Sequence, residues 1–187
     1  MHHLDKGAFT GEVSAPMLKS CGCDIVELAH AERYKYYNES DTIVNKKIKQ
    51  ALKYKLIPLI CVGEKKREVS YNKRINLLKK KINIFFSKIE KIPKNQKIIL
   101  AYEPIWAIGK SKSASIEYTE NTINFIKNYT LKKLKIQSNQ LFVIYGGSVN
   151  KKNARYFIKS QIIDGIFIGR SAINAKDFIE ICKMVDL

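Results

Sequence analysis

Five short apolar runs alternate with longer amphipathic segments, and this alternation constrains the fold of the 187-residue chain more than any other feature. The runs are rich in Val, Ile, Leu and aromatic residues, which is typical of strands buried in a parallel sheet. They cover residues 24–28, 56–62, 97–102, 141–145 and 165–169.

The segments between the runs carry helical patterns. In the first of them apolar residues recur with a period close to 3.6, at Ile43, Val44, Ile48, Ala51 and Leu52. Helices are predicted over residues 42–54, 72–89, 117–134, 150–159 and 175–184. Strand and helix in regular alternation predict βα units and a parallel sheet. Because the sequence holds no Gly-, Ser- or Pro-rich linker, we predict one α/β domain over residues 1–187.

The net charge of +17, from 34 basic and 17 acidic residues, is the most unusual compositional feature. Clustered basic residues favour nucleic-acid binding because they release counterions from phosphates. Here, however, 29 of the basic residues are Lys and only 5 are Arg, beside 27 Ile and 13 Asn. This joint excess is what AT-rich codons produce, and Arg, the favoured reader of bases, is scarce. We therefore expect no nucleic-acid partner, and a nucleic-acid-binding function rests on net charge alone.

Other function classes are disfavoured by hydropathy and cysteine content. No run approaches the roughly 20 apolar residues of a membrane span, and the start lacks the apolar stretch of a signal peptide. This predicts a soluble, cytoplasmic domain without a membrane partner. Cys21 and Cys23 are too close for the usual zinc pair and have no second cluster, so no metal is expected. Cys61, inside a strand, is interpreted as a buried small hydrophobe.

Two residues at the carboxyl ends of predicted strands are candidates for catalysis, since ligands bind there in α/β folds. Glu103 ends the third strand beside apolar residues, where desolvation would raise its basicity and suit it to act as a general base. The alternative is a helix-capping or salt-bridged acid. His30 ends the first strand and opens a short helix. Its alternative is a structural histidine with satisfied hydrogen bonds.

Two glycine-bearing turns are candidates for binding an anion. They are Gly146-Gly147-Ser148 and Gly169-Arg170, each following a predicted strand. Such turns can aim backbone N–H groups at a phosphate. The alternative is that these glycines only supply turns.

Six segments, in the same order along the chain, resemble the triosephosphate isomerase family. The most specific covers residues 101–109 and resembles the family's sixth strand with its catalytic Glu and mobile lid. The six are Gly7-Ala8-Phe9-Thr10-Gly11-Glu12-Val13-Ser14, His30-Ala31-Glu32-Arg33, Ile60-Cys61-Val62-Gly63-Glu64, Ala101-Tyr102-Glu103-Pro104-Ile105-Trp106-Ala107-Ile108-Gly109, Tyr145-Gly146-Gly147-Ser148-Val149 and Asp164-Gly165-Ile166-Phe167-Ile168-Gly169. This resemblance implies a (β/α)8 TIM barrel of which about the last five βα units are present, truncated at the N-terminal side.

The resemblance also implies a role for each candidate residue. Glu103 would remove a proton from the carbon beside the substrate carbonyl and return it to the neighbouring carbon. His30 would polarise the carbonyl as a neutral imidazole beside a helix N-terminus, with lid closure excluding water. The substrate phosphate would be bound by Gly109, Ser148, Gly169 and Arg170. Neither metal nor organic cofactor is implied. The loop from Gly7 to Glu12 would insert into a second subunit, which implies a homodimer.

The implied activity is interconversion of dihydroxyacetone phosphate and D-glyceraldehyde 3-phosphate through an enediolate, in glycolysis and gluconeogenesis. The alternative is a catalytically impaired or inactive fragment, because the family's first strand supplies an Asn and a cationic Lys and no segment here matches that strand. An incomplete barrel would also expose two sheet edges.

Three single residues and one segment of the lid depart from the family pattern. Ala31 replaces a Ser whose hydroxyl could cap the short helix, and Arg170 stands where Gly is usual. The lid contains Lys110-Ser111-Lys112 where the family usually has Thr-Gly-Lys, so its hinge is expected to differ. Glu27 occupies a normally apolar strand position, where an unpaired buried carboxylate would be costly.

Overall fold

A four-stranded parallel sheet forms the centre of the computed structural model, which describes residues 1–110 and 113–185. The strands lie in chain order: β1 (Ile25–Leu28), β2 (Ile57–Val62), β3 (Ile98–Tyr102) and β4 (Leu141–Tyr145). Each pair is parallel, with Leu28 opposite Ile60 and Ile60 opposite Leu100. This sheet confirms the fold class predicted from the alternation of apolar runs and helical segments.

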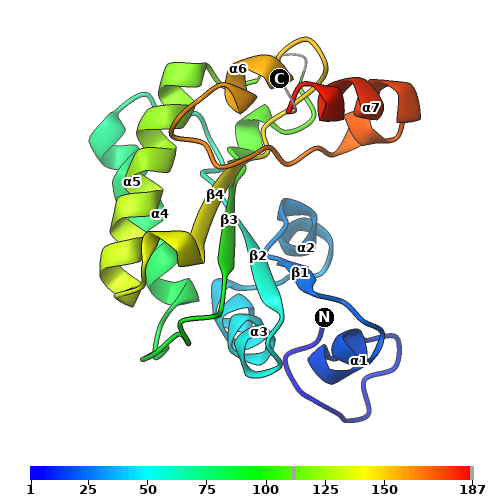
Figure 1. Cartoon of the computed structure of the whole chain (residues 1–187). Helices are drawn as coiled ribbons and strands as arrows, with labels where there is room; N and C mark the ends of the chain where they lie inside the picture. The colour runs from blue at the N-terminus through cyan, green and yellow to red at the C-terminus, as the bar shows by residue number, and fades with distance from the viewer. Residues whose placement is uncertain (111–112, 186–187) are drawn as a thin grey trace.

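Helices cover one face of the sheet. These are α3 (Asp41–Lys53), α4 (Tyr71–Phe85) and α5 (Ile116–Leu134), and Figure 1 shows α4 and α5 side by side along that face. Ser40, Ser70 and Ser115 cap their N-termini, each accepting a hydrogen bond from the backbone N–H three residues on.

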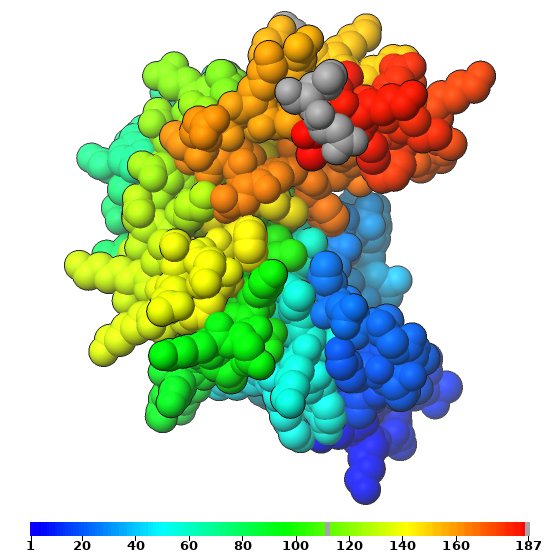
Figure 2. Space-filling view, in the orientation of Figure 1, coloured from blue at the N-terminus to red at the C-terminus, as the bar shows by residue number. Residues whose placement is uncertain are grey.

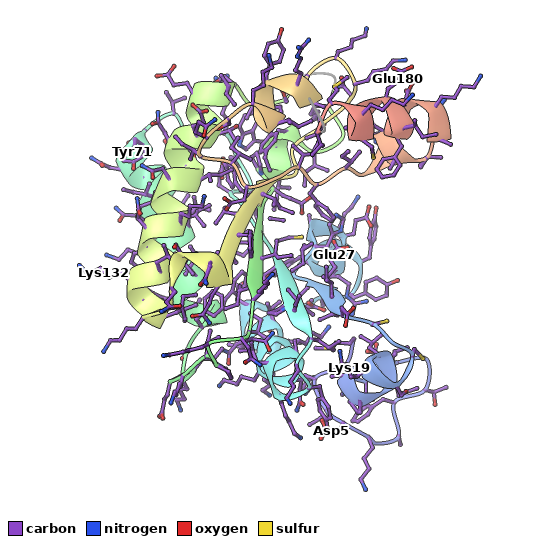
Figure 3. The ribbon with its side chains drawn as sticks, in the orientation of Figure 1. Asp5, Lys19, Glu27, Tyr71, Lys132 and Glu180 are labelled. Carbon is purple, nitrogen blue, oxygen red and sulfur yellow. The ribbon has the colours of Figure 1, made fainter. Side chains whose placement is uncertain are left out.

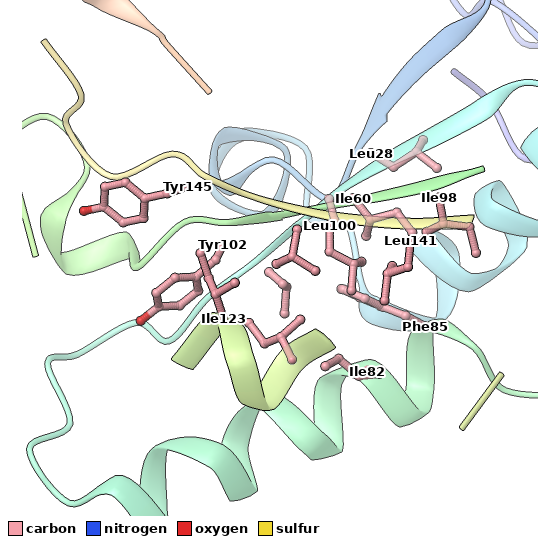
Figure 4. Close-up of a cluster of buried hydrophobic side chains, with 14 of the residues drawn as sticks. Leu28, Ile60, Ile82, Phe85, Ile98, Leu100, Tyr102, Ile123, Leu141 and Tyr145 are labelled. Atoms are coloured by element: carbon pink, nitrogen blue, oxygen red, sulfur yellow. The ribbon is translucent and has the colours of Figure 1, made fainter. Parts of the chain in front are cut away.

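The hydrophobic core lies between these helices and the sheet (Figure 4). Ile60 and Leu100 of the strands and Ile82 and Ile123 of the helices lie together in this core, and Leu28 of β1 is buried as well. Successive residues of a strand face opposite sides of a sheet. The strand residues on either side of these core residues therefore lie on the face turned away from the helices.

That other face of the sheet is only partly covered. Ile25 is 50% exposed, and Leu59, Ile99 and Phe142 are partly exposed. In Figure 2 the C-terminal segment and the N-terminal segment both project on this side of the molecule. Glu27 also lies on this face and is exposed, so the cost of an unpaired buried carboxylate does not arise there (Figure 3). Its side chain lines the cavity at the carboxyl ends of the strands, which gives the carboxylate access to solvent.

The prediction of a fifth strand over residues 165–169 was wrong, because this run forms only an isolated β-bridge. It runs beside β4 with a single bridge between Tyr145 and Ile166, and the N–H of Phe167 donates to the carbonyl of Tyr145 over 2.8 Å. The Asp164 carboxylate accepts a hydrogen bond from the N–H of Val143, taking the place of a backbone partner. Within the described residues no further strand pairs along the outer edge of this run. It therefore lacks the second row of backbone hydrogen bonds that stabilises an inner strand.

The remaining elements are short. They are α1 (Ala15–Ser20), α2 (Ala31–Tyr36), η1 (Ile105–Ala107), η2 (Ser138–Gln140), α6 (Ala154–Ile158), η3 (Arg170–Ala172) and α7 (Ala175–Lys183). The helix predicted from residue 150 begins only at Ala154, because side chains of Asn150 and Asn153 accept hydrogen bonds from nearby backbone N–H groups. Asp177 lies in the first turn of α7. None of the helices in the described ranges is both long and apolar enough to cross a membrane.

Candidate active site

The loops that follow the strands surround a cavity of about 980 Å³ at the carboxyl ends of the sheet. All six site residues predicted from the sequence line it: His30, Glu103, Gly109, Ser148, Gly169 and Arg170. A second hollow, of about 1160 Å³, lies between α2 and α4 and contains none of these six residues.

Glu103 follows β3 directly and is only 5% exposed. Its N–H donates to the carbonyl of Val62 over 2.9 Å, which extends the pairing with β2. Two glycines make room for it. A β-carbon at position 63 would overlap the Glu103 carbonyl, and one at position 146 would lie 2.7 Å from its Cγ. The position of Glu103 is therefore fixed by close contacts with the backbone at Gly63 and Gly146, which follow the two neighbouring strands.

Burial raises the pKa of the Glu103 carboxyl above its usual range. The influence of the Cys61 thiol and of His30 acts in the opposite direction, whereas the carboxylates of Glu27 and Glu32 raise the pKa further. Oε2 of Glu103 is buried and has no hydrogen-bond partner among the residues that the structure describes. A desolvated carboxyl with a free oxygen facing a cavity has the properties of a general base.

His30 is the N-cap of α2. The N–H of Glu32 donates to Nδ1 of His30 over 3.4 Å, so Nε2 is the ring nitrogen free to donate to a ligand. This contact corrects the expectation that Ala31, in place of Ser, removes a side chain that could cap the helix. Residue 31 is the first helical residue, and the cap is supplied by the histidine before it. Ala29 enables this turn with a left-handed backbone (φ 63°), a strained conformation for a residue other than glycine.

The loop after β3 begins with η1, which is held by the carboxylate of Glu64, a residue without a predicted role. Glu64 is 4% exposed and accepts hydrogen bonds from Nε1 of Trp106 over 2.8 Å and from the hydroxyls of Tyr102 and Tyr118. The signal for it was present, because Glu64 follows an apolar strand just as Glu103 does.

Ser148 and Arg170 contact the loop after β3 from the other side of the cavity. The hydroxyl of Ser148 donates to the carbonyl of Ala107 over 2.7 Å and accepts from the N–H of Lys110 over 3.1 Å. The guanidinium of Arg170 lies against Gly109, since a β-carbon there would be 3.1 Å from Nη2 of Arg170. The predicted change of hinge at Ser111 and Lys112 lies outside the described residues.

Cys61 is buried as predicted, but it is more than a small hydrophobe. Its Sγ donates to Oε1 of Glu27 over 3.7 Å, and burial raises the pKa of its thiol, with Glu103 and Glu27 adding to the effect. Among the described residues, no group of three His, Cys, Asp or Glu side chains is arranged to hold a metal ion.

Parallel strands with helices on one face, and an acid and an imidazole at the strand carboxyl ends, define part of a (β/α)8 barrel. Comparison with known proteins identifies which one. The family model described as triosephosphate isomerase matches residues 1–185. The chain belongs to the triosephosphate isomerase family, and it is therefore an isomerase by family.

Individual relatives agree with this assignment. A triosephosphate isomerase from Mycoplasma mobile is 41% identical over 97% of this chain and 71% of its own length. An L-erythrulose-1-phosphate isomerase from Mesorhizobium japonicum is 42% identical over 97% of this chain and 70% of its own. The crystal structure of triosephosphate isomerase from Bartonella henselae superposes with a TM-score of 0.83 at 32% identity, covering this whole chain and 75% of that one. These shares agree with the prediction of a partial barrel.

Proposed function

We propose that the chain interconverts dihydroxyacetone phosphate and D-glyceraldehyde 3-phosphate by proton transfer through an enediolate, as a cytoplasmic enzyme of glycolysis and gluconeogenesis. The observation that carries the proposal is Glu103, a buried carboxyl with a raised pKa and an unpartnered Oε2, in one cavity with His30. In this role Glu103 removes the proton beside the substrate carbonyl and delivers it to the neighbouring carbon. General base catalysis of this kind typically contributes about 10²–10⁴ in rate.

His30 is assigned the polarisation of the carbonyl. With Nδ1 accepting from the backbone of α2, Nε2 carries the hydrogen that can stabilise the negative oxygen of the enediolate. Losing one such donor typically costs about 10²–10³ in kcat.

The phosphate group is assigned to the opposite side of the cavity. Gly109, Ser148 and Gly169 border it there, and the Arg170 guanidinium supplies a positive charge beside the lid. A guanidinium pairs well with phosphate oxygens because its N–H groups are fixed in a planar fork. No metal or organic cofactor is assigned a role.

The loop from Gly7 to Glu12 is assigned to the interface of a homodimer. All its residues are exposed, and Phe9 presents an aromatic ring that is 40% exposed. Large exposed aromatic side chains are enriched in protein interfaces. The second candidate function is a catalytically impaired relative of the same family, which the partly uncovered inner face of the sheet favours.

Turnover by the purified 187-residue chain separates these functions. Dihydroxyacetone phosphate and L-erythrulose 1-phosphate are supplied in parallel, with the Glu103→Gln variant as the matched control. Conversion of dihydroxyacetone phosphate that falls about 10²-fold or more in the variant supports the proposal. Conversion of neither substrate, by a chain that is folded, supports the impaired relative. Preference for the four-carbon substrate contradicts the assignment of the triose.

A further inference from the structure

The hollow between α2 and α4, of about 1160 Å³, has a wall of aliphatic side chains. On α4 this wall consists of Leu77, Leu78 and Ile84. Leu78 is buried, whereas Leu77 is 51% exposed and Ile84 is 39% exposed. Ligand sites in proteins typically have volumes of about 300–1,000 Å³ and mostly apolar linings. The hollow is therefore large enough and apolar enough to hold a small organic molecule.

Five lysines also line the hollow, and none of them forms an ion pair within the described residues. They are Lys35, Lys65, Lys66, Lys80 and Lys81. Four carboxylates line it as well, and three of these accept hydrogen bonds from the chain itself. Asp41 accepts from the hydroxyl of Tyr34 over 2.7 Å, and Glu68 accepts from the N–H of Ser70 over 3.0 Å. Glu64 accepts from the three donors that hold η1. The lysine charges are thus without a carboxylate partner, whereas the carboxylates have donors of their own.

Lys81 is the lysine best placed to meet the acidic group of a ligand. It is half-buried, and its Nζ lies 4.5 Å from the centre of the Tyr34 ring and 5.7 Å from that of Phe85. Residues three or four positions apart lie on the same face of a helix, so Lys81 lies between Leu77 and Ile84 on α4. One side of the hollow therefore joins a cation to an apolar surface.

The surroundings of Lys81 disfavour its positive charge. Desolvation lowers the pKa of Lys81, and Lys65 adds to this effect against the opposing charge of Asp41. The aromatic rings attract the ammonium, but no carboxylate of the described residues lies within 4 Å of it. A half-buried charge without a counter-charge costs free energy, and an anion in the hollow would supply that counter-charge.

We propose that the hollow between α2 and α4 binds a small amphipathic anion, whose acidic group pairs with Lys81 and whose apolar part lies against Leu77, Leu78 and Ile84. An alkyl or aryl carboxylate, sulfonate or phosphate has this chemistry. The site is separate from that of the proposed substrate, because a triose phosphate has no apolar part to cover these side chains.

The first experiment measures binding of anilinonaphthalene sulfonate, an aryl sulfonate whose fluorescence rises in apolar surroundings, to the full chain. Lys81→Met removes the charge but keeps an unbranched side chain, so we expect the Kd of the dye to rise about tenfold. Lys79→Met, at an exposed position of α4 outside the hollow, is the matched control and should leave the Kd unchanged. An unchanged Kd in Lys81→Met, or an equal rise in both variants, would overturn the proposal.

The second experiment uses the parent chain alone, so that it does not depend on the folding of a variant. Methyl NMR follows a titration with the same dye, and we expect the signals of Leu77 and Ile84 to shift. Ile25 and Ile99, on the partly covered face of the sheet, are the internal control. Shifts at Ile25 and Ile99 without a shift at Ile84 would show that the dye binds the sheet face, and would contradict a site in the hollow.

Competition against the bound dye separates the acidic group from the apolar part. Octanoate should displace the dye, whereas octanol, which lacks the charge, and inorganic phosphate, which lacks the apolar part, should displace it far less at equal concentration. Displacement by octanol as strong as that by octanoate would refute the role of the charge. Displacement by phosphate would place the dye in the proposed active site and overturn the proposal. A chain without isomerase turnover contradicts the proposed function and leaves this binding test intact.

Discussion

At the scale of single residues, the candidate site could be predicted from the sequence because acidic, imidazole, hydroxyl and guanidinium side chains follow the predicted strands. Glu103, His30, Ser148 and Arg170 all line the predicted cavity. What the sequence could not provide was the environment of each. The burial of Glu103 depends on the absence of β-carbons at positions 63 and 146. The exposure of Glu27 depends on which segments pack over β1, and the residues next to Glu27 in the sequence do not determine that.

Gly146→Ala is expected to displace the Glu103 carboxylate, the proposed general base. Its new β-carbon would lie 2.7 Å from Cγ of Glu103, closer than side chains pack, so the Glu103 side chain must move. A displacement of about 1 Å can cost on the order of 10² in rate. Steady-state kinetics of the variant beside the parent chain checks this, with circular dichroism as the control for folding. An unchanged kcat would show that Glu103 is not held by this contact.

Glu103→Gln is expected to stabilise the fold at neutral pH. Burial raises the pKa of Glu103 in the folded state, so the folded chain binds this proton more tightly than the unfolded chain. The carboxyl therefore destabilises the fold as the pH rises through its raised pKa, and Gln removes that cost. Below the ordinary pKa of Glu the two chains should converge in stability. Urea unfolding across this pH range measures the difference, and a Gln variant less stable at pH 7 would contradict the burial.

At the scale of elements, apolar periodicity predicted strands β1 to β4 and helices α3, α4, α5 and α7. It failed where local polar contacts decide the outcome. The run over residues 165–169 has strand composition, but Asp164 takes the backbone donor of Val143 and the pairing ends at one bridge. The segment from Asn150 has helical spacing, but two Asn side chains hold it in a turn. Competition between side chains and the backbone for hydrogen bonds depends on the three-dimensional positions of these groups, which the spacing of apolar residues does not predict.

Lys135→Gly is expected to stabilise the chain by roughly 1 kcal/mol. Lys135 ends α5 in a left-handed conformation (φ 52°), which costs a residue with a β-carbon and suits glycine. Lys132→Gly, on an exposed position within the same helix, is the matched control and should destabilise by about 1 kcal/mol. Chemical denaturation gives both values. Equal destabilisation by the two substitutions would contradict the assigned end of α5.

At the scale of the whole molecule, the family and the architecture agree, while the inner face of the sheet is only partly covered. The order of the motifs predicted a partial barrel, and the match to residues 1–185 with 75% coverage of a solved relative supports it. The sequence could not show how far the inner face is open, because this depends on how the segments outside the sheet pack in three dimensions.

Hydrogen exchange should follow this architecture. Backbone amides of β1 and of residues 165–169 lie at the margins of the sheet, whereas β2 and β3 pair on both sides. Edge groups open more readily because fewer contacts protect them. Mass spectrometry of peptides after exchange in D2O should therefore show β1 exchanging well before β3. Uniformly slow exchange in all strands would show that the edges are covered in solution.

The central claim is that Glu103 transfers a proton between two carbons of a triose phosphate, and deuterium tests it most directly. Dihydroxyacetone phosphate is converted by the purified chain in D2O, and the product is examined by NMR. A base that exchanges its proton with solvent before returning it should place deuterium on the carbon beside the product aldehyde, and Glu103→Gln should remove this labelled product almost entirely. Labelled product formed at the same rate by the parent chain and by the Glu103→Gln variant, or no product from the folded parent chain, would contradict the claim.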